Sequence, residues 1–148
     1  MLDADELERR KPVWTAMSTL WLDTEISDIE IARIADTLIA SGYPRAQLDD
    51  ILLYEIAPVV GSNLLAPAGV WEGFDTAWLH QQARRRADHR SPWLRFWMWT
   101  PIGRALLTYA MKSEWQAVLR IVDQHAVDQH VAGQHARAGA ETDVETSR

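Results

Sequence analysis

Apolar residues recur at intervals of three and four along most of the chain, which is the spacing of one face of an α-helix. The first such face contains Val13, Met17 and Leu20. Pro12 is expected in the first turn of that helix, where its missing N–H costs nothing, with residues 3–11 forming an acidic turn or a kinked extension ahead of it. No segment alternates cleanly between apolar and polar residues over about six positions, so the pattern predicts an all-α, irregular bundle of about five to seven helices.

Helix-boundary signals divide the first half of the chain. Ser27 and Glu30 have the spacing of a capping box, which opens a second helix, and Gly42 is placed to end it. Pro44 is expected to start a third helix, which Pro58 should kink or end. The apolar stripe of this third helix consists of Leu48, Ile51, Leu52, Ile56 and Val59.

A glycine-containing stretch, residues 61–73, is predicted to form an ordered loop. Asp75 is placed to cap the helix that follows this loop. Ser91 and Thr100 each precede a proline, so each is expected to cap a further helix.

The last predicted helix is long, and its apolar pattern fades near residue 131. Its stripe consists of Met111, Trp115, Val118, Leu119 and Val122. Small and charged residues follow, and such a segment buries too little surface to offset the entropy of ordering it. We therefore expect a single helical domain over residues 1–131 and a disordered polar tail over residues 132–148.

Composition narrows the class of protein. The chain has eight tryptophans, most of which are expected in the core because each large ring buries roughly 150–250 Å². The absence of cysteine excludes a disulfide scaffold, a thiol nucleophile and a zinc site built on thiolates. The formal net charge of −6, the charged N-terminus and the lack of a membrane-length apolar run predict a cytoplasmic protein without a membrane partner.

No motif in the sequence assigns a cofactor, a metal or a catalytic residue. The glycines form no phosphate-binding loop, and neither a nucleophile elbow nor a kinase signature is present. His125, His130 and His135 recur every five residues, which turns successive side chains by about 140° around a helix. Metal-binding pairs on a helix are four residues apart, so these histidines predict no metal site.

Glu55 is the residue that most suggests chemistry, because it lies on the apolar stripe of its predicted helix. A buried carboxylate is costly unless it is paired or hydrogen-bonded. It therefore indicates either a functional acid with a raised pKa or a structural acid that receives an arginine or backbone N–H groups from the 61–73 loop. The structural alternative is favoured, since no second acid accompanies Glu55 for acid–base catalysis.

Other acidic residues are candidates for contact with a protein partner. Asp23 and Glu25 lie at a predicted junction between helices, where they either bind a partner or stabilise the N-terminus of the next helix. Glu72 and Asp75 are further candidates, together with Trp71 as an aromatic anchor.

A basic stretch interleaved with aromatic residues follows. Its leading arginines are Arg84, Arg85, Arg86 and Arg90, and its aromatic residues are Trp93, Phe96, Trp97 and Trp99. Exposed arginines beside aromatic rings bind phosphate and stack on bases. The alternative is that the rings face the core while the arginines pair with acids elsewhere in the chain.

Four segments resemble a family of small bacterial proteins of unknown function. They are Arg10–Trp14, Leu20–Glu25, Leu53–Val59 and Gly69–Asp75. The resemblance covers roughly residues 8–80, leaving the arginine–tryptophan stretch and the tail outside it. It implies a bacterial origin and brings no activity, cofactor or catalytic residue with it.

These features favour a non-enzymatic protein-binding domain, for which an immunity-type inhibitor of a bacterial toxin is one form. The alternative is a nucleic-acid- or phosphate-binding module that uses the stretch from Arg84 to Arg104. An enzyme centred on Glu55 is a third hypothesis, with no substrate indicated. The sequence leaves the oligomeric state open.

Overall fold

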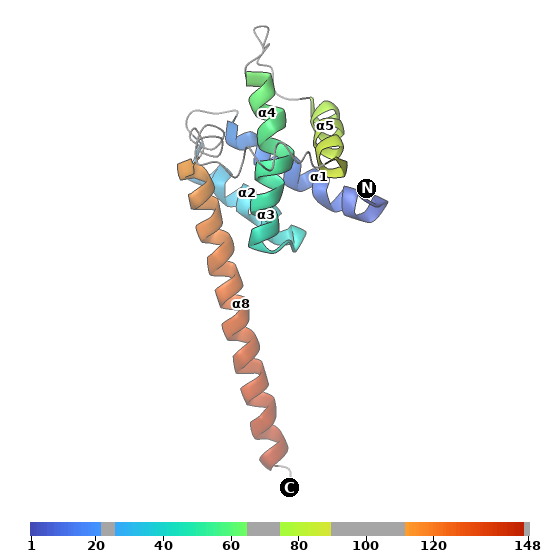
Figure 1. Cartoon of the computed structure of the whole chain (residues 1–148). Helices are drawn as coiled ribbons and strands as arrows, with labels where there is room; N and C mark the ends of the chain where they lie inside the picture. Colours follow the sequence, from blue (N-terminus) through green and yellow to red (C-terminus); the bar gives the residue numbers. More distant parts are fainter. Residues whose placement is uncertain (22–25, 65–74, 90–111, 147–148) are drawn as a thin grey trace.

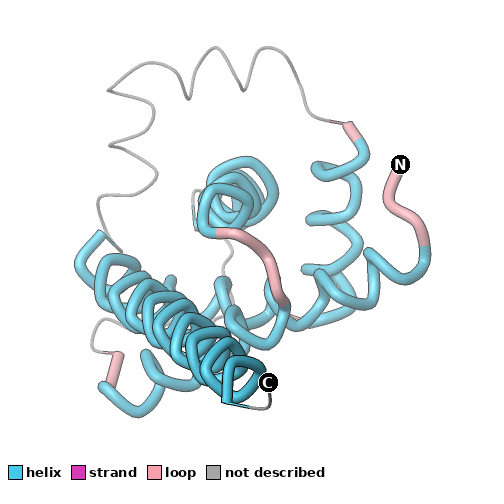
Figure 2. The backbone as a smooth tube through the Cα atoms, turned by 90° about the horizontal axis from the view of Figure 1, so that it is seen from below, coloured by secondary structure: helices cyan, strands magenta, loops and turns pink. Residues whose placement is uncertain are grey.

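The computed structural model confirms an all-α architecture (Figure 1). It describes residues 1–21, 26–64, 75–89 and 112–146. These ranges contain five helical rods and no strand (Figure 2). The rods are α1 (Ala4–Ser18) with a 3₁₀ turn η1 (Thr19–Trp21), α2 (Asp28–Ser41), the continuous rod α3 (Arg45–Ile51), η2 (Leu52–Ile56) and α4 (Ala57–Leu64), then α5 (Thr76–Asp88) and α8 (Lys112–Thr146).

Helix α1 begins earlier than the sequence predicts. The Asp3 carboxylate accepts a hydrogen bond from the Glu6 backbone N–H at 2.8 Å and so caps the helix at Ala4. Pro12 lies inside this helix and not in its first turn. The upstream turns are retained because Arg10 is buried and the aliphatic Leu7 packs against the core, which outweighs the backbone hydrogen bond that proline removes.

Helix α2 has the boundaries that its capping signals predict. The Ser27 hydroxyl accepts from the Glu30 N–H, and the Glu30 carboxylate accepts from the Ser27 N–H, which completes the capping box. At the other end Gly42 adopts a left-handed conformation with φ of 69°. Only glycine adopts this conformation without steric cost, so the chain turns there into the next helix.

The α3–η2–α4 rod passes through the middle of the fold. It does not end at Pro58, and residues 61–64, predicted as part of a loop, continue α4. Just before Pro58 the α-helical pattern is interrupted by the π-helical turn η2. At the end of this turn the Ala57 N–H donates a hydrogen bond to the Leu52 carbonyl. A π turn widens the backbone and leaves room for a proline ring that would otherwise clash with the carbonyl four residues earlier.

The core lies where α1, α2, α5 and the base of α8 surround the central rod. Trp14 and Trp115 are buried in it, and Trp21 and Trp78 pack against it partly exposed. The tryptophans at 71, 93, 97 and 99 lie outside the described residues, as do the helices expected after Ser91 and Thr100. The largest fully buried hydrophobic side chains are those of Trp14, Met17, Leu38, Leu48, Ile51, Leu52, Ile56 and Leu79.

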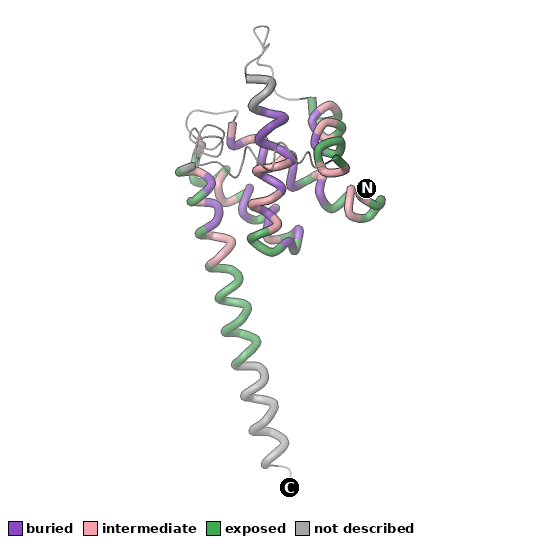
Figure 3. Tube along the Cα trace, in the orientation of Figure 1, coloured by how far each residue is buried: buried purple, intermediate pink, exposed green. Residues whose placement is uncertain are grey.

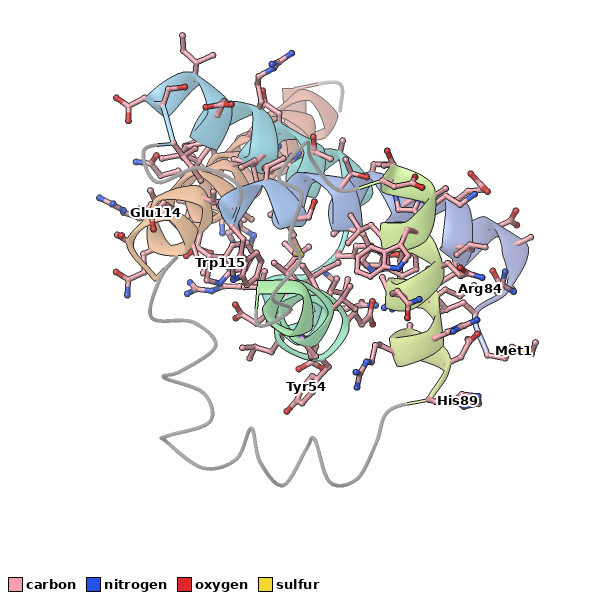
Figure 4. The ribbon with its side chains drawn as sticks, turned by 90° about the horizontal axis from the view of Figure 1, so that it is seen from above. Met1, Tyr54, Arg84, His89, Glu114 and Trp115 are labelled. Carbon is pink, nitrogen blue, oxygen red and sulfur yellow. The ribbon has the colours of Figure 1, made fainter. Side chains whose placement is uncertain are left out.

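Helix α8 packs on the domain only through its first turns. Val118 and Leu119 are buried, and the Trp115 indole N–H donates to the Asp49 carboxylate at 3.0 Å (Figure 4). Residues 124–134 are all exposed, and the helix runs away from the domain (Figure 3). Helix α8 is assigned as far as Thr146. The division into a domain over residues 1–131 and a polar tail over residues 132–148 stays a prediction. None of the described helices combines the length and the apolarity required of a membrane span.

Candidate functional site

Glu55 is fully buried, with 0% of its surface exposed. The π turn η2 directs it toward α1, where its Oε1 accepts a hydrogen bond from Arg10 Nη1. Its Oε2 accepts from the Trp14 indole N–H at 2.8 Å. Both oxygens are therefore hydrogen-bonded and one is ion-paired, which is what a buried carboxylate requires.

The Arg10–Glu55 pair is continued by further polar contacts. Arg10 Nε donates to Glu6 at 2.9 Å, and the Tyr43 hydroxyl donates to the same Glu6 oxygen at 2.9 Å. The Arg9 guanidinium lies 4.2 Å from the centre of the Tyr43 ring. Burial opposes the Arg10 charge, but the hydrogen bond and attraction of Glu55 outweigh it and raise the pKa of Arg10.

This buried network connects two of the segments that carry the family resemblance. Arg10 and Trp14 are the ends of one segment, and Glu55 lies in another. The network ties α1 to the central rod, and neither Arg10 nor Glu55 presents more than 6% of its side chain to solvent. Its geometry is that of an internal brace, because a substrate cannot reach Glu55 without separating these helices.

A groove lies between α1 and α2. Its volume is about 620 Å³. One face of α1 and η1, one face of α2 and a single residue of α5 form its walls. The lining residues that the structure describes are Glu8, Lys11, Pro12, Thr15, Ala16, Thr19, Ile26, Glu30, Arg33, Ile34, Thr37 and His80.

The floor of the groove is largely apolar and its rim is charged. On the α1 rim Lys11 forms an ion pair with Glu8. On the α2 rim the Glu30 carboxylate is occupied by the capping box. Arg33 is exposed and has no ion pair among the described residues, so it is a cation available to a bound group.

His80 closes one end of the groove wall. Its Nε2 lies 2.9 Å from the Thr15 hydroxyl, and its ring lies 6.1 Å from the Trp14 ring, centre to centre. Burial and the nearby Lys11 ammonium lower the pKa of His80 below its ordinary value of 6.5. The imidazole is therefore neutral at pH 7, and it connects the groove to the residue that holds Glu55.

This pKa shift predicts a pH dependence of stability. Because the folded chain binds a proton at His80 less readily than the unfolded chain, the contribution of His80 is present above pH 6.5 and is lost as pH falls below it. The free energy of unfolding, measured by urea denaturation between about pH 7 and 5, should fall less steeply for His80→Gln than for the wild type. The same substitution at the exposed His125 is the control, and equal slopes for all three proteins would contradict the prediction.

The structure places only some of the residues predicted to contact a partner. Asp75 is exposed, and its carboxylate caps α5 by accepting from the Ala77 N–H at 2.9 Å. Asp23, Glu25, Trp71 and Glu72 lie outside the described residues.

The predicted basic stretch is likewise only partly described. Arg84, Arg85 and Arg86 are exposed on α5, with Arg84 turned to the side away from α8 in Figure 4 and 3.7 Å from Asp88. Arg90 and the aromatic residues predicted beside these arginines lie outside the described ranges.

Among the described residues no cluster of potential ligands could hold a metal ion. His125 and His130 each contact a glutamine on the same helix.

Sequence reasoning missed the groove, although α1 contains a signal for it. Pro12, Thr15, Ala16 and Thr19 have helical spacing and lie beside the buried face of α1. A second helix face made of small, uncharged residues indicates a place where another backbone can approach closely.

Comparison with known proteins identifies a family but no relative of known activity. No curated protein and no solved structure matches this chain. The family model described as "Domain of unknown function (DUF7079)" matches residues 8–121. The match extends beyond residues 8–80 and includes the arginine–tryptophan stretch that the sequence resemblance left outside. The chain therefore belongs to this family of unknown function, DUF7079.

Proposed function

We propose that this chain is a non-enzymatic protein-binding domain that holds a helical segment of its partner in the α1–α2 groove. The observation that carries the proposal is the groove itself, with its apolar floor and its charged rim. Proteins that recognise an amphipathic helix use such a groove, in which apolar anchors fill the floor and polar residues meet the rim.

The shape of the groove supports a helix as the occupant. Its lining on the α1 side runs from Glu8 to Thr19, which corresponds to about 16 Å along a helix axis, or three turns. Pro12 and Ala16 are small enough to allow a second helix to approach closely. The volume of the groove, about 620 Å³, also lies within the range of small-molecule sites, so the argument for a helix rests on the length of the groove and on its apolar floor.

The specific form that we propose is a cytoplasmic, immunity-type inhibitor of a bacterial toxin. The net charge of −6 supports it, because an acidic protein is steered toward the basic surface of a nucleic-acid-cleaving or similar toxin. In this proposal Asp23, Glu25, Trp71, Glu72 and Asp75 remain candidates for further contacts with the partner. The remaining support is by analogy with small acidic helical inhibitors.

The alternative is a nucleic-acid- or phosphate-binding module that uses Arg84, Arg85, Arg86 and Arg90. This alternative is supported by the exposure of Arg84, Arg85 and Arg86 on helix α5. It requires oligonucleotide binding that weakens steeply as salt is raised.

In the immunity-type form of the proposal, the partner is a toxin encoded by the adjacent gene. Filling the groove should therefore weaken binding to the product of that gene, measured by isothermal titration calorimetry. Ala16→Arg places a long charged side chain over the groove floor and should weaken binding at least about 100-fold, since displaced apolar contacts and a buried charge each cost more than 1.4 kcal/mol. Expression of the wild-type chain should also restore growth of cells that produce that gene product.

Ala40→Arg is the matched control, because Ala40 is an exposed alanine of α2 outside the groove. It should bind like the wild type. Equal affinities for the two variants, with circular dichroism showing both folded, would contradict the assignment of the groove. A neighbour that neither binds nor is toxic would contradict the immunity-type form of the proposal.

A further inference from the structure

The outer part of α8 carries an apolar stripe that nothing described in the chain covers. Val127 is 61% exposed and Val131 is 44% exposed, and they lie one helical turn apart. Both belong to the few large hydrophobic residues that are exposed among the described residues. A helix without tertiary packing is only marginally stable in water, so this segment gains stability if its stripe is covered.

The charged residues beside the valine stripe indicate which protein surface could cover it. The outer part of α8 carries two acids, Asp123 and Asp128. Arg120 lies on the same side of the helix and lines a shallow hollow together with Val127 and Asp128. Asp123 is paired with Arg45 of the same chain, whereas Asp128 flanks the valine stripe and has no ion pair among the described residues. The rim of the α1–α2 groove carries two acids and two bases, namely Glu8, Lys11, Glu30 and Arg33. Of the two bases, Arg33 is exposed and has no ion pair among the described residues.

We propose that, when no other partner is bound, the outer part of α8 from one copy of the chain lies in the α1–α2 groove of a second copy. Val127 and Val131 then fill the apolar floor, and Asp128 pairs with Arg33. This inference rests on the proposed function in one respect, namely that the groove accepts a helix. A second copy is required because α8 runs straight away from its own domain and cannot fold back onto its own groove.

The exchange is reciprocal in the simplest arrangement. Each copy contributes the α1–α2 groove and the outer part of α8, so a two-fold axis occupies both grooves and closes the assembly as a dimer. The two-fold arrangement buries the helix-in-groove contact twice. A foreign helix would then compete with α8 for the same groove.

Light scattering coupled to gel filtration tests the proposal on the full-length chain. The wild type should elute with twice the monomer mass of 16.9 kDa at high concentration. Val127→Asp combined with Val131→Asp should give a monomer, because it places two charges on the stripe without touching the core. His125→Asp combined with Gln129→Asp adds the same acids on the opposite face of the same exposed segment and should leave the dimer intact.

Charge exchange tests the groove as the docking site. Arg33→Asp should raise the dimer dissociation constant several-fold, and adding Asp128→Arg to it should restore dimerisation. Ala16→Arg should also give a monomer. A wild-type chain that is monomeric at all concentrations would overturn this inference while leaving the binding of a foreign partner to be measured separately. A dimer that persists in the valine variant, or one that Ala16→Arg does not weaken, would overturn it as well.

Discussion

Replacing Arg10 with methionine should lower the free energy of unfolding by about 3–5 kcal/mol, because it leaves the Glu55 carboxylate buried without its counter-charge. Methionine keeps most of the side-chain volume, so the loss reflects the charge and its hydrogen bonds more than packing. Urea denaturation followed by tryptophan fluorescence measures it. A domain of ordinary stability has about 5–15 kcal/mol in total, so the midpoint should shift markedly.

A double variant of Arg10 and Glu55 separates the energy of their ion pair from the energies of their other contacts. Glu55→Gln alone should also destabilise the fold, since the Arg10 guanidinium is then buried beside a neutral amide. Arg10→Met with Glu55→Gln should cost less than the sum of the single changes, because no unpaired charge remains. Glu6→Gln removes the other, partly exposed partner of Arg10 and should cost less than Arg10→Met. Additive losses in the double variant would contradict the account of an internal ion pair.

The second large effect is expected for Trp14→Phe, which should cost about 2–4 kcal/mol. The substitution removes the indole N–H from Glu55 Oε2, so a buried carboxylate oxygen loses its donor. It also leaves a cavity in the core, because Trp14 is completely buried. Thermal or urea unfolding of the purified variant gives the value.

Trp115→Phe is the matched control for this prediction. The Trp115 indole N–H also donates to a carboxylate, but Asp49 is only partly buried and water can replace the lost donor. The expected loss is about 1–2 kcal/mol. A cost for Trp14→Phe no greater than that for Trp115→Phe would mean that Glu55 does not depend on its donors.

Local signals in the sequence predict much of this fold. The capping box at Ser27 and Glu30, the glycine at 42 and the cap at Asp75 each act within a few residues, so their effects are visible in the sequence itself. The two prolines disrupt their helices less than their positions in the sequence predict. Pro12 and Pro58 lie inside helices because packing holds α1 together and because η2 widens the backbone, and both causes depend on tertiary contacts.

The candidate site also combines features that local sequence predicts with features that depend on tertiary contacts. The burial of Glu55 follows from its position on an apolar stripe, which is a property of one helix. The identity of its partners depends on how α1 crosses the central rod, and no spacing in the sequence reveals that crossing. The groove is also a property of two packed helices, so composition and periodicity could indicate its residues but not bring them together.

Nuclear magnetic resonance of the ¹⁵N-labelled full-length chain tests the central claim, that this braced domain works by binding a protein segment between α1 and α2. Adding the product of the adjacent gene should shift the backbone amides of groove residues such as Thr15, Ala16 and Thr37. A parallel addition of a short oligonucleotide at low salt should leave the spectrum unchanged. Shifts confined to Arg84, Arg85 and Arg86, with groove amides unmoved in both titrations, would contradict the claim and favour the nucleic-acid alternative.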